Sequence, residues 1–165
     1  MLLFNRRHML ALALGLGVSA CGFEPVYKQG TTASALQGQI DIDLVKGRNG
    51  FELREELENQ LGFADGNAPY ILTFKLTTTE TGLAVTEDEG TTRTNLNGVA
   101  AFTVRRRDTG TVVYQDSVKN VTAYGTRSAT FPSAVAKRDA NTRLVKALAG
   151  QIANRIAITS DDWAT

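Results

Sequence analysis

The chain has 165 residues, with 18 Lys and Arg against 17 Asp and Glu, one Cys and one His. This length fits one domain, and the near-neutral charge argues against a nucleic-acid-binding protein, which normally carries a strong basic excess. A single Cys excludes an intramolecular disulfide and a CxxC zinc or redox site.

The first 20 residues have the layout of an export signal. The pair Arg6-Arg7 precedes an apolar stretch over residues 9–18. This stretch is about half of the roughly 20 residues that a spanning helix needs, so we expect no transmembrane anchor. Removal of residues 1–20 would also remove His8, the only His. The mature protein would then lack imidazole for Ser-His-Asp or Cys-His catalysis and for metal binding, and we expect neither a metal nor another cofactor.

The sequence Val18-Ser19-Ala20-Cys21 resembles the bacterial lipobox. The resemblance implies that cleavage leaves Cys21 as the first residue and that its thiol is acylated. Two or three acyl chains anchor a protein firmly, because each buried CH₂ is worth about 0.8 kcal/mol. In lipobox proteins an Asp after the Cys favours the inner membrane, so Gly22 implies the outer membrane. The alternative is an ordinary signal with an incidental buried Cys, and twin-arginine and general export both stay open.

The mature chain begins with a predicted lipidated tether over residues 21–35, which contains Pro25 and a stretch rich in Gly, Thr and Gln. Apolar and polar residues then alternate over 40–44, the period of a half-buried strand. A domain is expected over residues 36–160, followed by a polar tail, 161–165, that frays.

A short amphipathic helix is predicted over residues 50–61. Asn49 and Glu52 have the spacing of a capping box, and Gly62 is suited to stop the helix. Leucines recur every four residues between them, at Leu53, Leu57 and Leu61.

Three strands and a long helix follow. Alternation predicts strands over 72–77, 91–107 and 112–124, with a loop or twisted crossing over 79–90 and a hairpin turn at Asp108-Thr109-Gly110. A loop with Gly125 and Pro132 then leads to an amphipathic helix over 134–158.

The element order is therefore β-α-β-β-β-α. It predicts an α+β two-layer sandwich, with two helices packed on one face of a mostly antiparallel four-stranded sheet. The central strands are longer than usual, and their second face is rich in Thr, Ser, Gln and Lys. Such strands would project past the helices unless something surrounds them.

The sequence Cys21-Gly22-Phe23-Glu24-Pro25-Val26-Tyr27 resembles the C-G-[FW]-x-[PL]-[LV]-[YR] start of mature lipopolysaccharide-assembly lipoproteins, the LptE family. The 72–76 strand and the segment Ala136-Lys137-Arg138-Asp139-Ala140 fit the same family. The resemblance implies a non-enzymatic outer-membrane lipoprotein. It would plug the lumen of the β-barrel LptD, help the barrel to assemble, and help deliver lipopolysaccharide to the outer leaflet.

Lipopolysaccharide carries phosphates or acidic sugars, so a contact site needs Arg or Lys near a loop tip. Lys137 and Arg138 are expected in the first turn of the long helix, beside the loop with Arg127, where amide donors add to an anion site. Lys137 also matches the family's basic position. Arg93 begins the long hairpin and is the second choice. The alternative for each is a solvated surface cation.

Three other groups have ordinary structural readings. The run Arg105-Arg106-Arg107 should split between the two faces of a strand, and Glu87-Asp88-Glu89 is expected to be a solvated acidic turn rather than a calcium site. Three aromatic residues either close the core or contact a partner: Tyr114, Tyr124 and Phe131.

Two other functions remain as alternatives. A free periplasm-facing lipoprotein that binds a lipid or glycan by itself would need an apolar cavity between the sheet and the helices. A hydrolase would need two facing carboxylates, whereas the acids here fall in predicted turns or on exposed helix faces.

Overall fold

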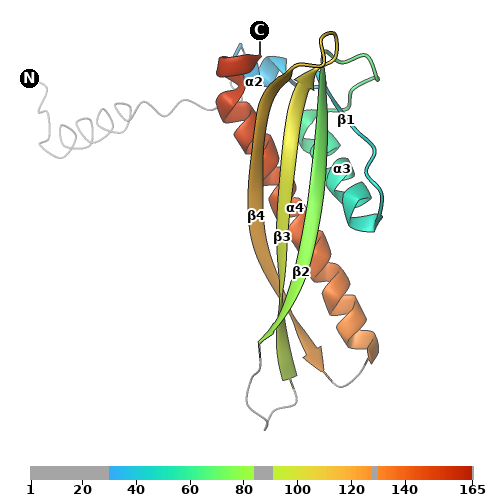
Figure 1. The fold of residues 1–165 in the computed structure, drawn as a ribbon. Helices are drawn as coiled ribbons and strands as arrows, with labels where there is room; N and C mark the ends of the chain where they lie inside the picture. The colour runs from blue at the N-terminus through green and yellow to red at the C-terminus, as the bar shows by residue number, and fades with distance from the viewer. Residues whose placement is uncertain (1–29, 84–90, 128–129, 165) are drawn as a thin grey trace, which may run out of the picture.

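The computed structural model describes residues 30–83, 91–127 and 130–164 (Figure 1). Cys21, the aromatic residues of the tether and the 87–89 acidic run lie outside these described residues. The elements are α2 (Thr32–Ala35), β1 (Ile40–Ile42), α3 (Arg48–Leu61), β2 (Tyr70–Leu83), β3 (Thr91–Arg106), β4 (Val112–Arg127) and α4 (Thr130–Trp163).

The four strands form one sheet in the order β1-β2-β3-β4. β1 runs parallel to β2, whereas β2, β3 and β4 pair antiparallel. In Figure 1 the helices α3 and α4 lie behind the sheet, and the face toward the viewer is uncovered. This arrangement confirms the predicted two-layer α+β sandwich, with short α2 as an additional helix.

The core lies between the sheet and the two long helices. Side chains alternate along each strand, so every second residue of β2, β3 and β4 points at the helices. The helices α3 and α4 pack apolar residues, placed at helical spacing, against these side chains. Fully buried members include Leu72, Ala100, Val104, Leu53, Leu57, Leu144, Leu148, Ile152 and Ile156.

α4 crosses β3 at Gly98, where the backbones come close. A Cβ built on Gly98 would lie 2.9 Å from Cδ2 of Leu144 and 3.0 Å from Cδ1 of Leu148. Both leucines are completely buried and have little room to move. The absence of a side chain at Gly98 therefore sets the distance between helix and sheet.

The predicted capping box of α3 is wrong. The helix begins at Arg48 after the N-cap Gly47, with no side-chain cap hydrogen bond. Asn49 lies inside the helix and donates through Nδ2 to Oδ1 of Asn141 on α4, at 2.9 Å. The predicted stop is confirmed, since Gly62 is the C-cap with φ of 84°.

The strands extend further than predicted. β2 continues through the segment expected to be a loop or twisted crossing as far as Leu83, in unbroken register with β3 back to Arg93. β4 likewise passes through Gly125 to Arg127, opposite Thr91. The hairpin turn is confirmed, since Gly110 has φ of 69° and its N–H donates to the carbonyl of Arg106 at 3.0 Å.

α4 is longer than predicted at both ends. It begins at Thr130 rather than at 134, with Pro132 in its first turn, where a missing N–H costs nothing. It continues to Trp163, whose ring meets Tyr70 edge-on at 5.3 Å and stacks on Tyr114 at 6.2 Å. The expected fraying from residue 161 is therefore wrong, because an aromatic contact holds the last turn.

None of the helices in the described part of the chain is both long enough and apolar enough to span a bilayer.

Candidate functional site

The structure brings the four predicted cations to one end of the molecule, the lower end in Figure 1. Arg93 lies near the start of β3, in register with Leu83 and Gly125. The backbone of Arg127 ends β4 opposite Thr91. Lys137 and Arg138 lie in the part of α4 that starts at this end.

Lys137 joins three elements through one carboxylate. Its Nζ lies 2.6 Å from Oε1 of Glu80 on β2. The hydroxyl of Tyr124 on β4 donates to Oε2 of the same carboxylate at 3.0 Å. The hydrogen bond from Lys137 lowers the pKa of Glu80 and, in return, raises the pKa of Lys137. Burial, followed by the bond to Glu80, raises the pKa of Tyr124. At neutral pH the cluster is a lysinium, a carboxylate and a neutral phenol.

The predicted position of Lys137 and Arg138 in the first helical turn is wrong. α4 begins at Thr130, about two turns earlier. The free amides of the helix N-terminus are thus not beside these side chains. Any anion held here would be held by the side chains alone. Arg138 is exposed, and none of the ion pairs among the described residues includes it.

Arg93 and Lys137 approach this end from opposite sides of the sheet. Leu96, three residues after Arg93, is buried under the helices, so the alternation of β3 turns Arg93 to the uncovered side. Lys137 is on α4, which packs on the covered side and reaches Glu80 there. The two residues can therefore touch one large ligand but do not form a single cation pocket.

The uncovered side of the sheet is polar, as predicted. We call it the open face: the residues of β2, β3 and β4 that alternate with the buried ones. Its exposed or half-exposed members with described side chains include Thr73, Lys75, Thr77, Thr79, Thr81, Arg93, Asn95, Asn97, Val99, Ala101, Thr103, Arg105, Gln115, Ser117, Lys119 and Val121.

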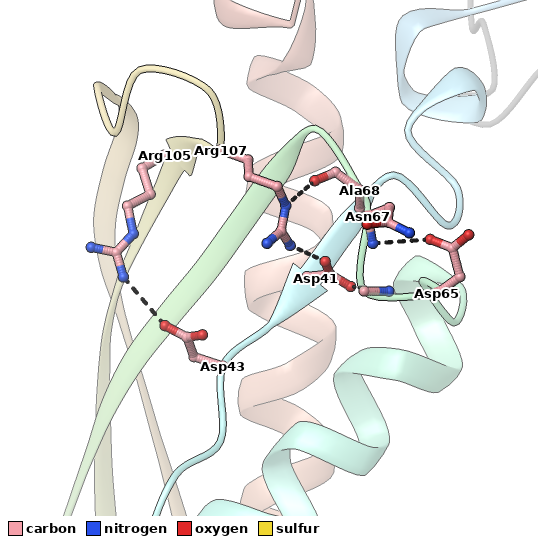
Figure 2. Close-up of polar contacts among 8 residues, drawn as sticks. Asp41, Asp43, Asp65, Asn67, Ala68, Arg105 and Arg107 are labelled. Carbon is pink, nitrogen blue, oxygen red and sulfur yellow. Dashed lines mark hydrogen bonds and ion pairs between the residues drawn. The ribbon is translucent and has the colours of Figure 1, made fainter.

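The run of three arginines lies at the other end of the molecule and is divided among local partners (Figure 2). Arg105 contacts Asp43 at 3.3 Å, and Arg106 contacts Asp108 at 3.1 Å. Arg107 donates through Nε to the carbonyl of Ala68 at 2.7 Å and through Nη2 to Asp41. These contacts fasten the hairpin to β1 and to the loop before β2, so the run is not one anion-binding patch.

A second feature of that end is an apolar hollow of about 500 Å³. It lies between α2, the β3–β4 hairpin and the last residue described, and its lining includes Leu36, Pro69, Tyr70 and Ala164. Within the described residues there is no group of three or more His, Cys, Asp or Glu placed to hold a metal ion.

The residues that sequence reasoning missed are the partners of Lys137. The sequence predicts a loop or a twisted crossing at Glu80, and for Tyr124 it leaves both a core role and a partner contact open. The structure makes Tyr124 both a buried residue and a hydrogen-bond donor. The only signal in the sequence was the continued Thr-rich run before Glu80, which favours a strand.

Comparisons with known proteins agree with this architecture. The family model LptE, described as lipopolysaccharide-assembly, matches residues 38–156. No curated protein matches the chain. A solved structure of a candidate lipoprotein from Caulobacter crescentus CB15 is similar, with a TM-score of 0.67 and 18% identity, over 78% of this chain and 96% of that one.

Two further structures share the fold. A minor lipoprotein from Acinetobacter baumannii has a TM-score of 0.58 and 18% identity, over 74% of this chain and 92% of that one. The rare lipoprotein B from Shewanella oneidensis has a TM-score of 0.54 and 12% identity, over 75% and 96% respectively. At these identities the likeness shows a common fold.

Proposed function

Because the chain belongs to the LptE family of lipopolysaccharide-assembly proteins, we propose that it is an outer-membrane lipoprotein anchored through acylated Cys21. In this proposal it plugs an LptD-type β-barrel, helps the barrel to assemble and helps deliver lipopolysaccharide to the outer leaflet. It acts as a binding subunit and not as an enzyme.

The observation that carries this proposal is the open face. β2, β3 and β4 have 14, 16 and 16 residues, beyond the usual 3–10. Their uncovered sides display hydroxyl, amide and cationic groups rather than an apolar surface. The lumen of a large outer-membrane barrel is polar and wet, so a long wedge with such a face suits it.

Lipopolysaccharide contact is proposed for Lys137, Arg93, Arg127 and Arg138. Their ion pairs suggest an order for these residues. Arg93 and Arg138 are exposed without an ion pair among the described residues, so a phosphate can reach them directly. Lys137 is paired with Glu80, so a phosphate must compete with that carboxylate.

The alternative, a free lipoprotein that binds a lipid or glycan alone, draws on the apolar hollow near Tyr70. The two functions predict different effects on the barrel when this protein is depleted from cells. If the chain helps a barrel to assemble, its depletion should lower the fraction of that barrel that shows the heat-modifiable gel mobility of a folded barrel. An unchanged folded fraction would favour the free lipoprotein.

A further inference from the structure

Within the described parts of β2, β3 and β4 the open face carries cations and no carboxylate, and the acids on that side of the sheet, Asp41 and Asp43, pair with Arg107 and Arg105 at the hairpin end. Lys75 lies on β2, Lys119 on β4 and Arg93 on the strand between them. The two acids of the described long strands are on the other side. Glu80 is in register with buried Leu96, and Asp116 with buried Phe102.

Within the described part of the chain, these three cations also have no ion pair. None of the ion pairs found among the described residues includes Lys75, Arg93 or Lys119, and all three are exposed. Several other cations of the described chain have a carboxylate close by, as Arg48 has Glu52 and Arg143 has Asp139, whereas Lys46, Arg138 and Lys146 also lie outside the ion pairs. A free surface normally mixes both signs of charge.

The helix α3, on the opposite side of the sheet, is net acidic. α3, which covers the other face of the sheet, carries four glutamates, Glu52, Glu55, Glu56 and Glu58, against Arg48 and Arg54. The open face of the long strands therefore presents cations, whereas the covered side mixes both signs, because α4 has more Lys and Arg than Asp and Glu. A complementary partner for that face is acidic.

The shape of the face favours a flat, regular partner. Lys75 is in register with Ala101 and Ser117, whereas Lys119 is in register with Val99 and Thr77. The two lysines are thus separated by two strand spacings, about 10 Å, and by one same-face step, about 7 Å. The side chains on one face of another β-sheet, such as the inner face of a barrel wall, repeat at the same intervals.

Beside Lys75, on the side away from Lys119, the face is low. A hollow of about 520 Å³ opens over Ala101, and its lining includes Thr73, Lys75, Thr103 and Gln115. Val99 and Val121 are also exposed on this face, at 43% and 56%. Small apolar side chains flanked by cations and hydroxyls let a second sheet approach closely.

We propose that the open face docks on an acid-lined strip of the partner barrel's inner wall, with Lys75 and Lys119 paired to Asp or Glu side chains of neighbouring barrel strands. This inference rests on the proposed function, since it states which face of the plug meets the barrel. The helices α3 and α4 are then turned toward the lumen.

The experiment is a charge reversal in the full-length chain, co-expressed with its barrel. The variant Lys75→Glu/Lys119→Glu should reduce the barrel recovered with the tagged protein from detergent extracts by at least tenfold. The matched control is Lys46→Glu/Lys146→Glu, which changes the charge equally at exposed residues away from the open face and should stay within twofold of wild type. Thermal unfolding of each variant checks that the fold is kept.

The outcomes separate the two proposals. If wild type recovers the barrel and the open-face variant recovers as much, the docking inference is wrong while the plug stands. If the reversal weakens only the binding of purified lipopolysaccharide, the face serves the glycolipid, and the inference is again overturned. If wild type recovers no barrel, the proposed function itself fails.

Discussion

Lys137 on α4 and Glu80 on β2 form an ion pair of 2.6 Å, which Tyr124 on β4 completes by donating to the same carboxylate. Lys137, the first residue predicted to contact lipopolysaccharide, therefore also links the long helix to the sheet. A structural role and a ligand role for Lys137 can be separated, because only the second one involves competition with Glu80.

The first prediction concerns lipopolysaccharide binding. Lys137→Asp should weaken the affinity of the purified protein for lipopolysaccharide, and Glu80→Gln should strengthen it severalfold, because it removes the competing carboxylate. Surface-immobilised lipopolysaccharide gives both affinities. Lys146→Asp, an exposed change elsewhere on α4, is the control. Equal affinities for the wild type and both Glu80 and Lys137 variants would remove Lys137 from the site.

The second prediction concerns pH. Since the hydrogen bond from Lys137 lowers the pKa of Glu80 in the folded protein, the contribution of the ion pair to the free energy of unfolding is present at neutral pH and is lost as the pH falls through that lowered pKa. The side chains of Lys137 and Glu80 are 47% and 40% exposed, so solvent screens the pair. The ion pair should therefore add only about 0.2–1 kcal/mol to the free energy of unfolding.

Urea unfolding from pH 7 down to pH 3 measures this contribution. Wild type should be more stable than Glu80→Gln at pH 7, and the two curves should converge in acid. When both proteins also carry Lys137→Gln, most of the loss of stability that Glu80→Gln causes at pH 7 should disappear. Parallel curves over the whole range would show that the pair does not stabilise the fold.

The third prediction concerns the hairpin end. Arg107→Ala should lower the free energy of unfolding by about 1–3 kcal/mol, because it leaves the carbonyl of buried Ala68 without its donor and breaks the contact with Asp41. Arg106→Ala, which removes a contact with Asp108 in the same exposed turn, should cost much less, because an exposed ion pair contributes little. Equal losses in chemical denaturation would contradict the role given to Arg107.

The fourth prediction concerns helix–sheet packing. Gly98→Val should destabilise the fold by about 1–3 kcal/mol, because the new side chain would overlap Leu144 and Leu148. Gly82→Val is a matched control in a neighbouring strand, since a Cβ there meets nothing within 4 Å. Thermal melts of both variants should differ clearly. A Gly98 variant as stable as the control would mean that α4 can move away from β3.

Much of the fold could be predicted because period-two and helical patterns are strong here. The alternation around Leu72 and the leucine repeat of α3 gave the right elements and the right core. Element ends were less predictable, because they depend on partners. β2 runs on to Leu83 because β3 pairs with it there, and the last turn of α4 is held by Trp163 against Tyr70.

The sequence predicts which cations belong to the candidate site, but it does not predict which side chains they contact. That the four cations share one end follows from hairpin topology. The link from Lys137 to Glu80 does not, since the two lie far apart in sequence and meet only when α4 packs on the sheet. The one-sided charge of the open face also needed the register, which assigns Glu80 and Asp116 to the covered side.

The fifth prediction concerns the anchor. Cys21→Ala should release the protein from membranes when its partner barrel is absent, because the acyl chains would be lost. Fractionation of cells that lack the barrel, followed by immunoblotting, tests this. A variant that stays fully in the membrane fraction would show that Cys21 does not anchor the chain.

The most direct test of the plug is recovery of its partner. Tagged full-length protein should be purified in mild detergent from outer membranes, and its companions should be identified by mass spectrometry and their stoichiometry by light scattering. We predict an equimolar complex with one β-barrel protein of LptD type. Elution of the protein alone, from cells in which that barrel is abundant, would contradict the account.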